Sequence, residues 1–113
     1  MYAIKGFTAT DDADWSETVE LIDGETNGPL DASDLAFELQ VKDGGQVVLS
    51  ATTADNSITR PSSSEIAWRF PRERMRGLCP GTTYKVGCVY IDLSGNVEQL
   101  FVGSLALIDG GMI

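Results

Sequence analysis

The chain has 113 residues, of which 42% are hydrophobic and 22% are charged. This composition predicts one folded domain, residues 1–113, with a sizeable core and no long disordered tail. The formal net charge of −9 argues against binding nucleic acid or an anionic membrane through the charge of the whole molecule. The chain has no histidine, which excludes a Ser-His-Asp triad, a His-paired thiol and a His-ligated zinc.

The first residues give no sign of a targeting or membrane segment. No run of 18 apolar residues occurs, and no basic start leads into an apolar stretch. We therefore expect a soluble protein made in the cytosol. The two cysteines, Cys79 and Cys88, are too few for a disulfide framework or a Cys-rich metal site. Free thiols are the expectation for the cytosol, and a bond between the two stays open.

Strand signals begin early in the chain. Residues 2–8 and 15–22 predict two strands. The clearest strand follows, because Leu35, Phe37, Leu39 and Val41 alternate with more polar residues, the period of a strand with one buried face. Asp43-Gly44-Gly45 then leads into the β-rich segment 46–53, which predicts a tight hairpin whose glycines adopt positive φ.

The second half of the chain predicts a short strand, a helical turn and a second hairpin. A short strand is predicted over 66–70, then a helical turn over 71–77 between a proline and a glycine. Segments 83–91 and 97–108 predict a second hairpin, whose loop carries Gly95 in the left-handed region. Gly103, inside the last strand, predicts a bulge or bend.

Seven or eight short strands separated by regular turns predict an all-β fold, an antiparallel two-sheet sandwich. The turn sequences leave segments of about 6 to 12 residues between them, the spacing of antiparallel β proteins. The predicted core consists of the large inward-facing residues Phe37, Leu39, Val41, Val48, Ile66, Trp68, Tyr84, Val86, Leu105 and Leu107. We expect Trp15 and Trp68 to lie in the core or in an interface.

Charge is distributed unevenly along the chain. Up to Asp34 there are nine acidic residues against Lys5 alone, whereas five of the remaining basic residues lie between residues 60 and 76. Two opposite patches would suit head-to-tail or ring assembly; the alternative is a set of solvated loops. The candidate partner contacts are Arg69, Arg72, Arg74, Arg76, Asp11, Asp12 and Asp14.

Catalytic and cofactor sites find little support. Segment 11–14 lacks the alternating oxygen ligands of a calcium loop, and no carboxylate pair is marked as an acid and base. No glycine-rich loop stands between a strand and a helix of useful length, so no phosphate cradle is predicted. The acidic body opposes nucleic-acid binding by the arginines of 69–76. We therefore predict a protein without a cofactor or metal that is not an enzyme.

The order of several motifs resembles a known group of proteins. These motifs are Asp31, Phe37-x-Leu39-x-Val41, Asp43-Gly44-Gly45-x-Val47, Leu78-x-x-Gly81-x-x-Tyr84, Gly95, Leu100 and Gly103-x-Leu105-x-Leu107. In this order they resemble the small immunoglobulin-like virion proteins of tailed bacteriophages, and they are similar to the N-terminal domain of upper baseplate proteins. The resemblance covers residues 15–109. The chain departs from the pattern at Thr82-Thr83, at Gly87-Cys88 and in the acidic segment 9–14.

The resemblance implies an immunoglobulin-like fold and a non-enzymatic structural role in the virion, as an adaptor in the tail tip, baseplate or neck. A capsid decoration or head-fibre-anchoring protein is one alternative. A carbohydrate- or protein-binding β-sandwich module is another. The implied partners are other virion structural proteins, contacted by several copies in a symmetric assembly, with no nucleic acid and no membrane. The implied location is the virion, after synthesis in the host cytoplasm.

Overall fold

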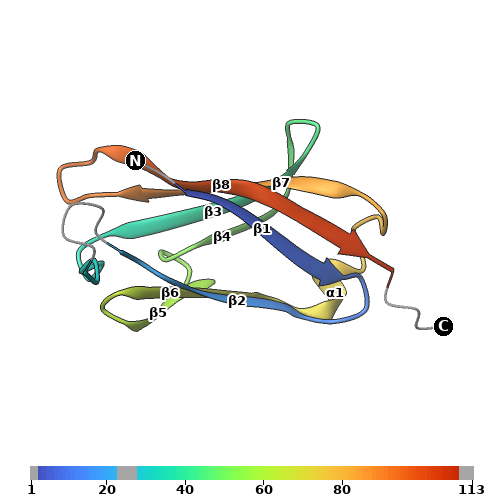
Figure 1. The fold of residues 1–113 in the computed structure, drawn as a ribbon, viewed down its shortest axis with the longest axis horizontal. Coiled ribbons are helices and arrows are strands. Elements are labelled where there is room, and N and C mark those ends of the chain that lie inside the picture. The colour runs from blue at the N-terminus through green and yellow to red at the C-terminus, as the bar shows by residue number, and fades with distance from the viewer. Residues whose placement is uncertain (1–2, 23–27, 110–113) are drawn as a thin grey trace.

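The computed structural model describes residues 3–22 and 28–109, which form an elongated body of 47 × 25 × 24 Å (Figure 1). Within these residues there are eight strands and one short helix. The elements are β1 (Ala3–Thr10), β2 (Trp15–Glu20), β3 (Ala36–Asp43), β4 (Gln46–Thr52), β5 (Ile58–Ser62), β6 (Glu65–Phe70), α1 (Arg72–Met75), β7 (Thr83–Ile91) and β8 (Val97–Ile108).

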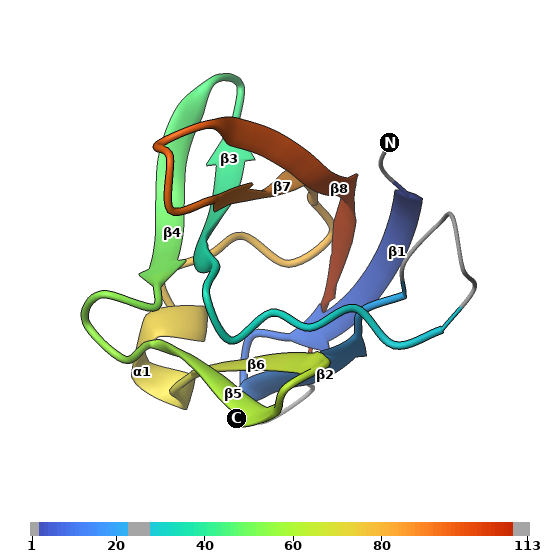
Figure 2. The same ribbon diagram turned by 90° about the vertical axis from the view of Figure 1, so that its left-hand side faces the viewer.

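The strands form two sheets that face each other (Figure 2). One sheet has five strands in the order β1-β8-β7-β3-β4, and the other has three in the order β2-β6-β5. Strands with one apolar face must cover it, and here the two apolar faces cover each other. The predicted all-β two-sheet sandwich is therefore confirmed.

Both predicted hairpins are present. Gly44 and Gly45 connect β3 to β4 with φ values of 59° and 94°, which residues other than glycine rarely adopt. Gly95 lies between β7 and β8 with a φ of 86°, as its position in the loop predicts.

Three details of the strand prediction are wrong. β1 and β8, the first and last strands, run in the same direction at one edge of the larger sheet and pair in parallel. The short strand β5 was not predicted, since only Ile58 of its residues is buried and no alternation marks it. Gly103 makes no bulge: it stays in register between Val86 and Lys5.

The helical turn is shorter than predicted. Residues 71–77 were expected to be helical with Pro71 in the first turn, whereas α1 spans Arg72–Met75. Pro71 occupies the N-cap position just before the helix, in an extended conformation with φ −70° and ψ 159°. The side chain of Met75 faces the core and fixes this turn against the sandwich.

Nine of the ten predicted core residues are buried, and Val48 is the exception because it is only partly buried. Val41 pairs with Leu49 and Lys42 pairs with Val47, so Val48 is the extra residue of a β-bulge on β4. The bulge shifts the alternation by one residue, and Leu49 takes the core position instead.

An aromatic cluster joins the two sheets in the core. Trp15 and Trp68, from the smaller sheet, have ring centroids 5.8 Å apart. Phe7 on β1 lies 5.7 Å from Trp15 and 5.8 Å from Trp68, both edge to face. Phe101 on β8 stacks on Trp68 at 6.1 Å. Both tryptophans therefore lie in the core.

The segment between α1 and β7 is fixed by Tyr84. Its hydroxyl accepts a hydrogen bond from the backbone N–H of Cys79, at 2.8 Å. The tyrosine is buried near the start of its strand and bonds a few residues upstream, the arrangement known as a tyrosine corner. Gly81, with φ 83°, makes the turn between the two residues.

We expect replacement of Trp68 by alanine to lower the free energy of unfolding by about 3 to 5 kcal/mol, because it removes a buried indole from the contact between the sheets. Chemical denaturation followed by fluorescence or circular dichroism measures this loss. A change below about 1 kcal/mol would show that the aromatic cluster does not hold the sheets together.

Tyr84→Phe keeps the buried ring and removes only the hydroxyl that bonds to Cys79. We expect a loss of about 1 kcal/mol in unfolding free energy, the typical net contribution of one hydrogen bond. Tyr90→Phe is the matched control, because it removes a hydroxyl whose hydrogen bond to Glu98 is exposed to solvent. If both variants lose the same amount, the tyrosine corner has no special role.

Candidate functional site

The two charged segments singled out in the sequence meet in the structure. Asp14 pairs with the guanidinium of Arg69 and accepts a hydrogen bond from the backbone N–H of Arg72 at 2.8 Å. Asp12 lies 3.5 Å from the Arg72 guanidinium and 3.3 Å from Nε of Arg76. These pairs join the loop between β1 and β2 to α1.

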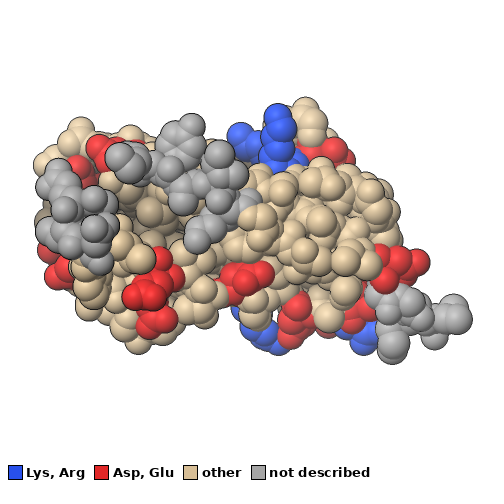
Figure 3. All heavy atoms as spheres, in the orientation of Figure 1, with Lys and Arg blue, Asp and Glu red and all other residues tan. Residues whose placement is uncertain are grey.

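Within the described residues, Asp12 and Asp14 therefore lie together with Arg69, Arg72 and Arg76 instead of on a separate surface. Figure 3 shows basic and acidic side chains side by side along the edge below β2 and α1. Arg74 lies over the ring of Phe70, 5.9 Å from its centroid, and the backbone N–H of Asp11 bonds to Ile108. Most of these charges neutralise one another within the chain, which favours a structural role for the cluster.

Metal and thiol chemistry find no site in the described part of the chain. No group of three or more Cys, Asp or Glu side chains there is arranged to hold a metal ion. Both thiols are free, with Cys79 exposed and Cys88 buried. Burial, together with the negative charge of Glu38, raises the pKa of Cys88 to about 12, so this thiol stays protonated and unreactive. No helix in the described residues could cross a membrane.

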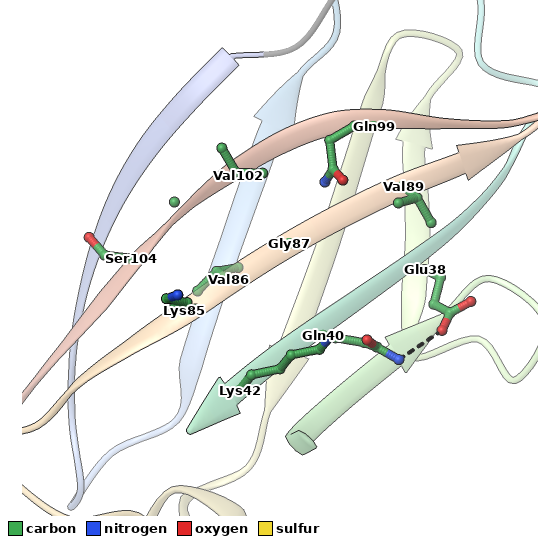
Figure 4. A pocket seen from close by; sticks show the side chains of 11 residues that line it. Glu38, Gln40, Lys42, Lys85, Val86, Gly87, Val89, Gln99, Val102 and Ser104 are labelled. Atoms are coloured by element: carbon green, nitrogen blue, oxygen red, sulfur yellow. Dashed lines mark hydrogen bonds between the residues drawn. The ribbon is translucent and has the colours of Figure 1, made fainter. Parts of the chain in front are cut away.

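The outer face of the larger sheet carries a shallow hollow of about 580 Å³ over β3, β7 and β8 (Figure 4). Gly87 forms its floor, because this residue of the central strand has no side chain between Gln40 on β3 and Val102 on β8. Val89 and Val102 add apolar walls. The hollow is open and lies across the strands, which suits a protruding segment better than an enclosed small molecule.

A β-bulge shapes one end of the hollow. Cys88 pairs with Phe101 and Val89 pairs with Gln99, so Leu100 is an extra residue on β8. The side-chain amide of Gln99 lies over the strands and donates to the carbonyls of Cys88 and Phe101, at 2.9 and 2.7 Å. These bonds fix the amide, so this end of the hollow is rigid.

Charge is graded along the hollow. Lys42 and Lys85 are direct cross-strand partners at one end, and Glu38 lies at the other end, as Figure 4 shows. Gln40 lies between them and donates to Glu38 at 3.1 Å. Sequence reasoning missed this site, because its residues are the outward-facing half of strands recognised by their buried half. The feature that marks the site is the pairing of Lys42 with Lys85 across two adjacent strands. This pairing becomes visible only when the register of the strands is known.

The turn between β7 and β8 presents an apolar side chain on a rigid frame. Asp92 accepts hydrogen bonds from the backbone N–H groups of Ser94 and Asn96, both at 2.9 Å, and from the Asn96 side chain at 3.2 Å. Bonding to Asn96 lowers the pKa of Asp92, which keeps it charged. Leu93, inside this turn, is 83% exposed, and Val97 beside it is 61% exposed.

Comparison with known proteins bears on the fold. No protein-family model matches the chain, and no curated protein matches it. Solved structures similar to it include the immunoglobulin-like domain of mouse leukocyte-associated immunoglobulin-like receptor 1, a strand-swapped dimer, with 12% identity, a TM-score of 0.48, and coverage of 92% of this chain and 88% of that one. The two sheets described above make this chain an all-β sandwich.

Two further structures have lower TM-scores. Extracellular domains 3–5 of Drosophila OTK match at 8% identity and a TM-score of 0.40, over 92% of this chain and 33% of that one. This chain therefore spans about a third of the length of the Drosophila fragment. The V domain of amphioxus IgVJ-C2 matches at 9% identity and a TM-score of 0.31, over 89% and 98% of the two chains.

Three hydrogen-bonded aspartates predict how the stability of the fold depends on pH. Hydrogen bonding to Arg69 and to the Arg72 backbone lowers the pKa of Asp14 below the usual 3.8, and bonds to Ser33 and Ser57 do the same for Asp31 and Asp55. A carboxyl with a lowered native pKa stabilises the fold above its unfolded pKa and loses this effect as the pH falls through the lowered value.

We therefore expect the unfolding free energy to fall as the pH drops below about 4. The unfolding free energy of the Asp14→Asn variant should fall less steeply than that of the wild type. Urea denaturation at a series of pH values measures both slopes. Asp34→Asn, at an exposed carboxylate away from α1, is the control. Equal slopes for the wild type and Asp14→Asn would contradict the role given to the pairing with Arg69.

Proposed function

We propose that the chain is a non-enzymatic structural component of a tailed-bacteriophage virion, an adaptor in the tail tip, baseplate or neck. The resemblance in the order of turn and core residues supports this role. The fold supports it as well, because immunoglobulin-like sandwiches typically serve as binding or structural modules. Its partners under this proposal are other virion proteins, which it contacts in several copies.

The observation that carries the proposal is the exposed Leu93 on its hydrogen-bonded turn. An apolar side chain that is 83% exposed gains free energy when a partner covers it. Because five backbone and side-chain bonds of Asp92, Gly95 and Asn96 already fix the turn, little conformational entropy is lost on binding. Such a feature suits a protein–protein contact more than catalysis.

Two alternatives remain proposals of lower rank. A capsid decoration or head-fibre-anchoring protein would use the same contacts at another place in the particle. A carbohydrate-binding module would need aromatic rings beside polar groups, but Trp15 and Trp68 are buried and no aromatic side chain lines the hollow. This observation favours the protein-binding form of the module.

Purified particles of the phage that encodes the chain test the proposal. We expect mass spectrometry to find the protein in gradient-purified particles at a fixed number of copies per particle. We expect Leu93→Ser to lower that number about tenfold or more while the protein still folds. Ser94→Ala, in the same turn, is the matched control. Absence of the wild-type protein from particles would overturn the virion role.

The arginines are a poorer target for this test. Reversal of Arg72 and Arg76 would place new acidic groups beside Asp12, which now pairs with both. The loop between β1 and β2 would then be repelled from α1, so lost incorporation would reflect a changed fold. Arg74→Glu alone avoids these pairs and reports on a partner contact at this edge.

A further inference from the structure

Two lysines on the outer sheet face lack the compensation that the other described basic side chains have. Arg69, Arg72 and Arg76 pair with aspartates, Arg60 donates to a backbone carbonyl, and Arg74 lies over an aromatic ring. The lysines in question, Lys42 and Lys85, are directly opposite each other on β3 and β7, and no carboxylate pairs with either in the described structure. Like charges in this position destabilise a sheet.

The shape of the hollow beside these lysines suits the binding of a protruding segment. Gly87 leaves its floor low, Val89 and Val102 make apolar walls, and Gln99 is fixed by two hydrogen bonds. An occupant that fits must be convex, must offer an apolar tip, and must carry negative charge where it meets Lys42 and Lys85.

The turn between β7 and β8 has all three properties. It protrudes from one end of the sandwich and carries Leu93 exposed at 83%, in a hydrogen-bonded frame. Asp92 and Glu98 flank the apolar residues as carboxylates, and Figure 3 shows acidic side chains at this end of the molecule. The turn is therefore convex, apolar at its tip and acidic at its sides.

We propose that the hollow binds the β7–β8 turn of a second copy of this chain, with Leu93 between Val89 and Val102 and the acidic flank against Lys42 and Lys85. Turn and hollow are different surfaces, so the contact is heterologous and each copy keeps one free turn and one free hollow. Repetition of the contact generates a ring or a filament, according to the rotation between neighbours. The inference does not depend on the virion role, because it concerns the isolated chain.

One contact of this kind is small, since a single turn enters a shallow hollow. We therefore expect weak association, with a dissociation constant between about 10 µM and 1 mM. Sedimentation velocity in buffer with about 0.15 M salt, which screens the repulsion between acidic copies, measures it over this range. The expected result is a sedimentation coefficient that rises with concentration. A wild-type chain that stays monomeric up to about 1 mM would overturn the proposal.

Two variants affect the two halves of the contact separately. Leu93→Ser changes the turn, and the double variant Lys42→Gln/Lys85→Gln changes the hollow; each should weaken association about tenfold or more. Arg60→Gln/Arg74→Gln changes the net charge equally outside the hollow and should leave association near the wild-type value. Circular dichroism checks that all variants fold.

Mixing the two defective variants gives the decisive result. A Leu93→Ser copy still has an intact hollow, and a Lys42→Gln/Lys85→Gln copy still has an intact turn. The mixture should form dimers with wild-type affinity and no larger species, because only one contact per pair is complete. If the mixture associates no better than each variant alone, the turn does not enter the hollow of a second copy. If only the lysine variant weakens association, a different surface occupies the hollow, and the proposal is wrong.

Discussion

The contact between Trp15 and Trp68 of the smaller sheet and Phe7 and Phe101 of the larger one is the interaction on which the remaining structure depends. It brings four large aromatic rings from the two sheets into contact between the sheets. With the sheets fixed there, the strand ends and the outer faces keep a constant geometry. The hollow over Gly87 and the turn that carries Leu93 both belong to the larger sheet, so this core holds them at a fixed separation.

Some residues stabilise the fold, and others remain available for contact with a partner. Asp12 and Asp14 use their charge to hold the first loop against α1, and Tyr84 fixes the segment that follows the helix. Lys42, Lys85 and Leu93 contribute little to the fold, because they point outward from strands and a turn that other residues stabilise. We expect the residues of the second group to contact other protein molecules.

The buried half of the fold follows from the sequence, whereas the surface arrangement does not. The alternation through Phe37, Leu39 and Val41 and the glycines at 44, 45 and 95 are local signals, and both hairpins follow from them. The parallel pairing of β1 with β8 and the bulge at Val48 depend on contacts between distant segments. The sequence places Asp12 about sixty residues from Arg72 and Arg76, so their pairing could not be predicted without the fold.

Electron cryomicroscopy of particles of the phage proposed to carry this chain tests the central proposal, that the sandwich is a structural adaptor whose copies contact one another. We expect density for the sandwich in a symmetric ring or array, with the β7–β8 turn of each copy against the face of its neighbour around Gly87. Density in which the copies are isolated, with both the turn and that face in solvent, would contradict the self-contact, and a particle without the sandwich would contradict the adaptor role.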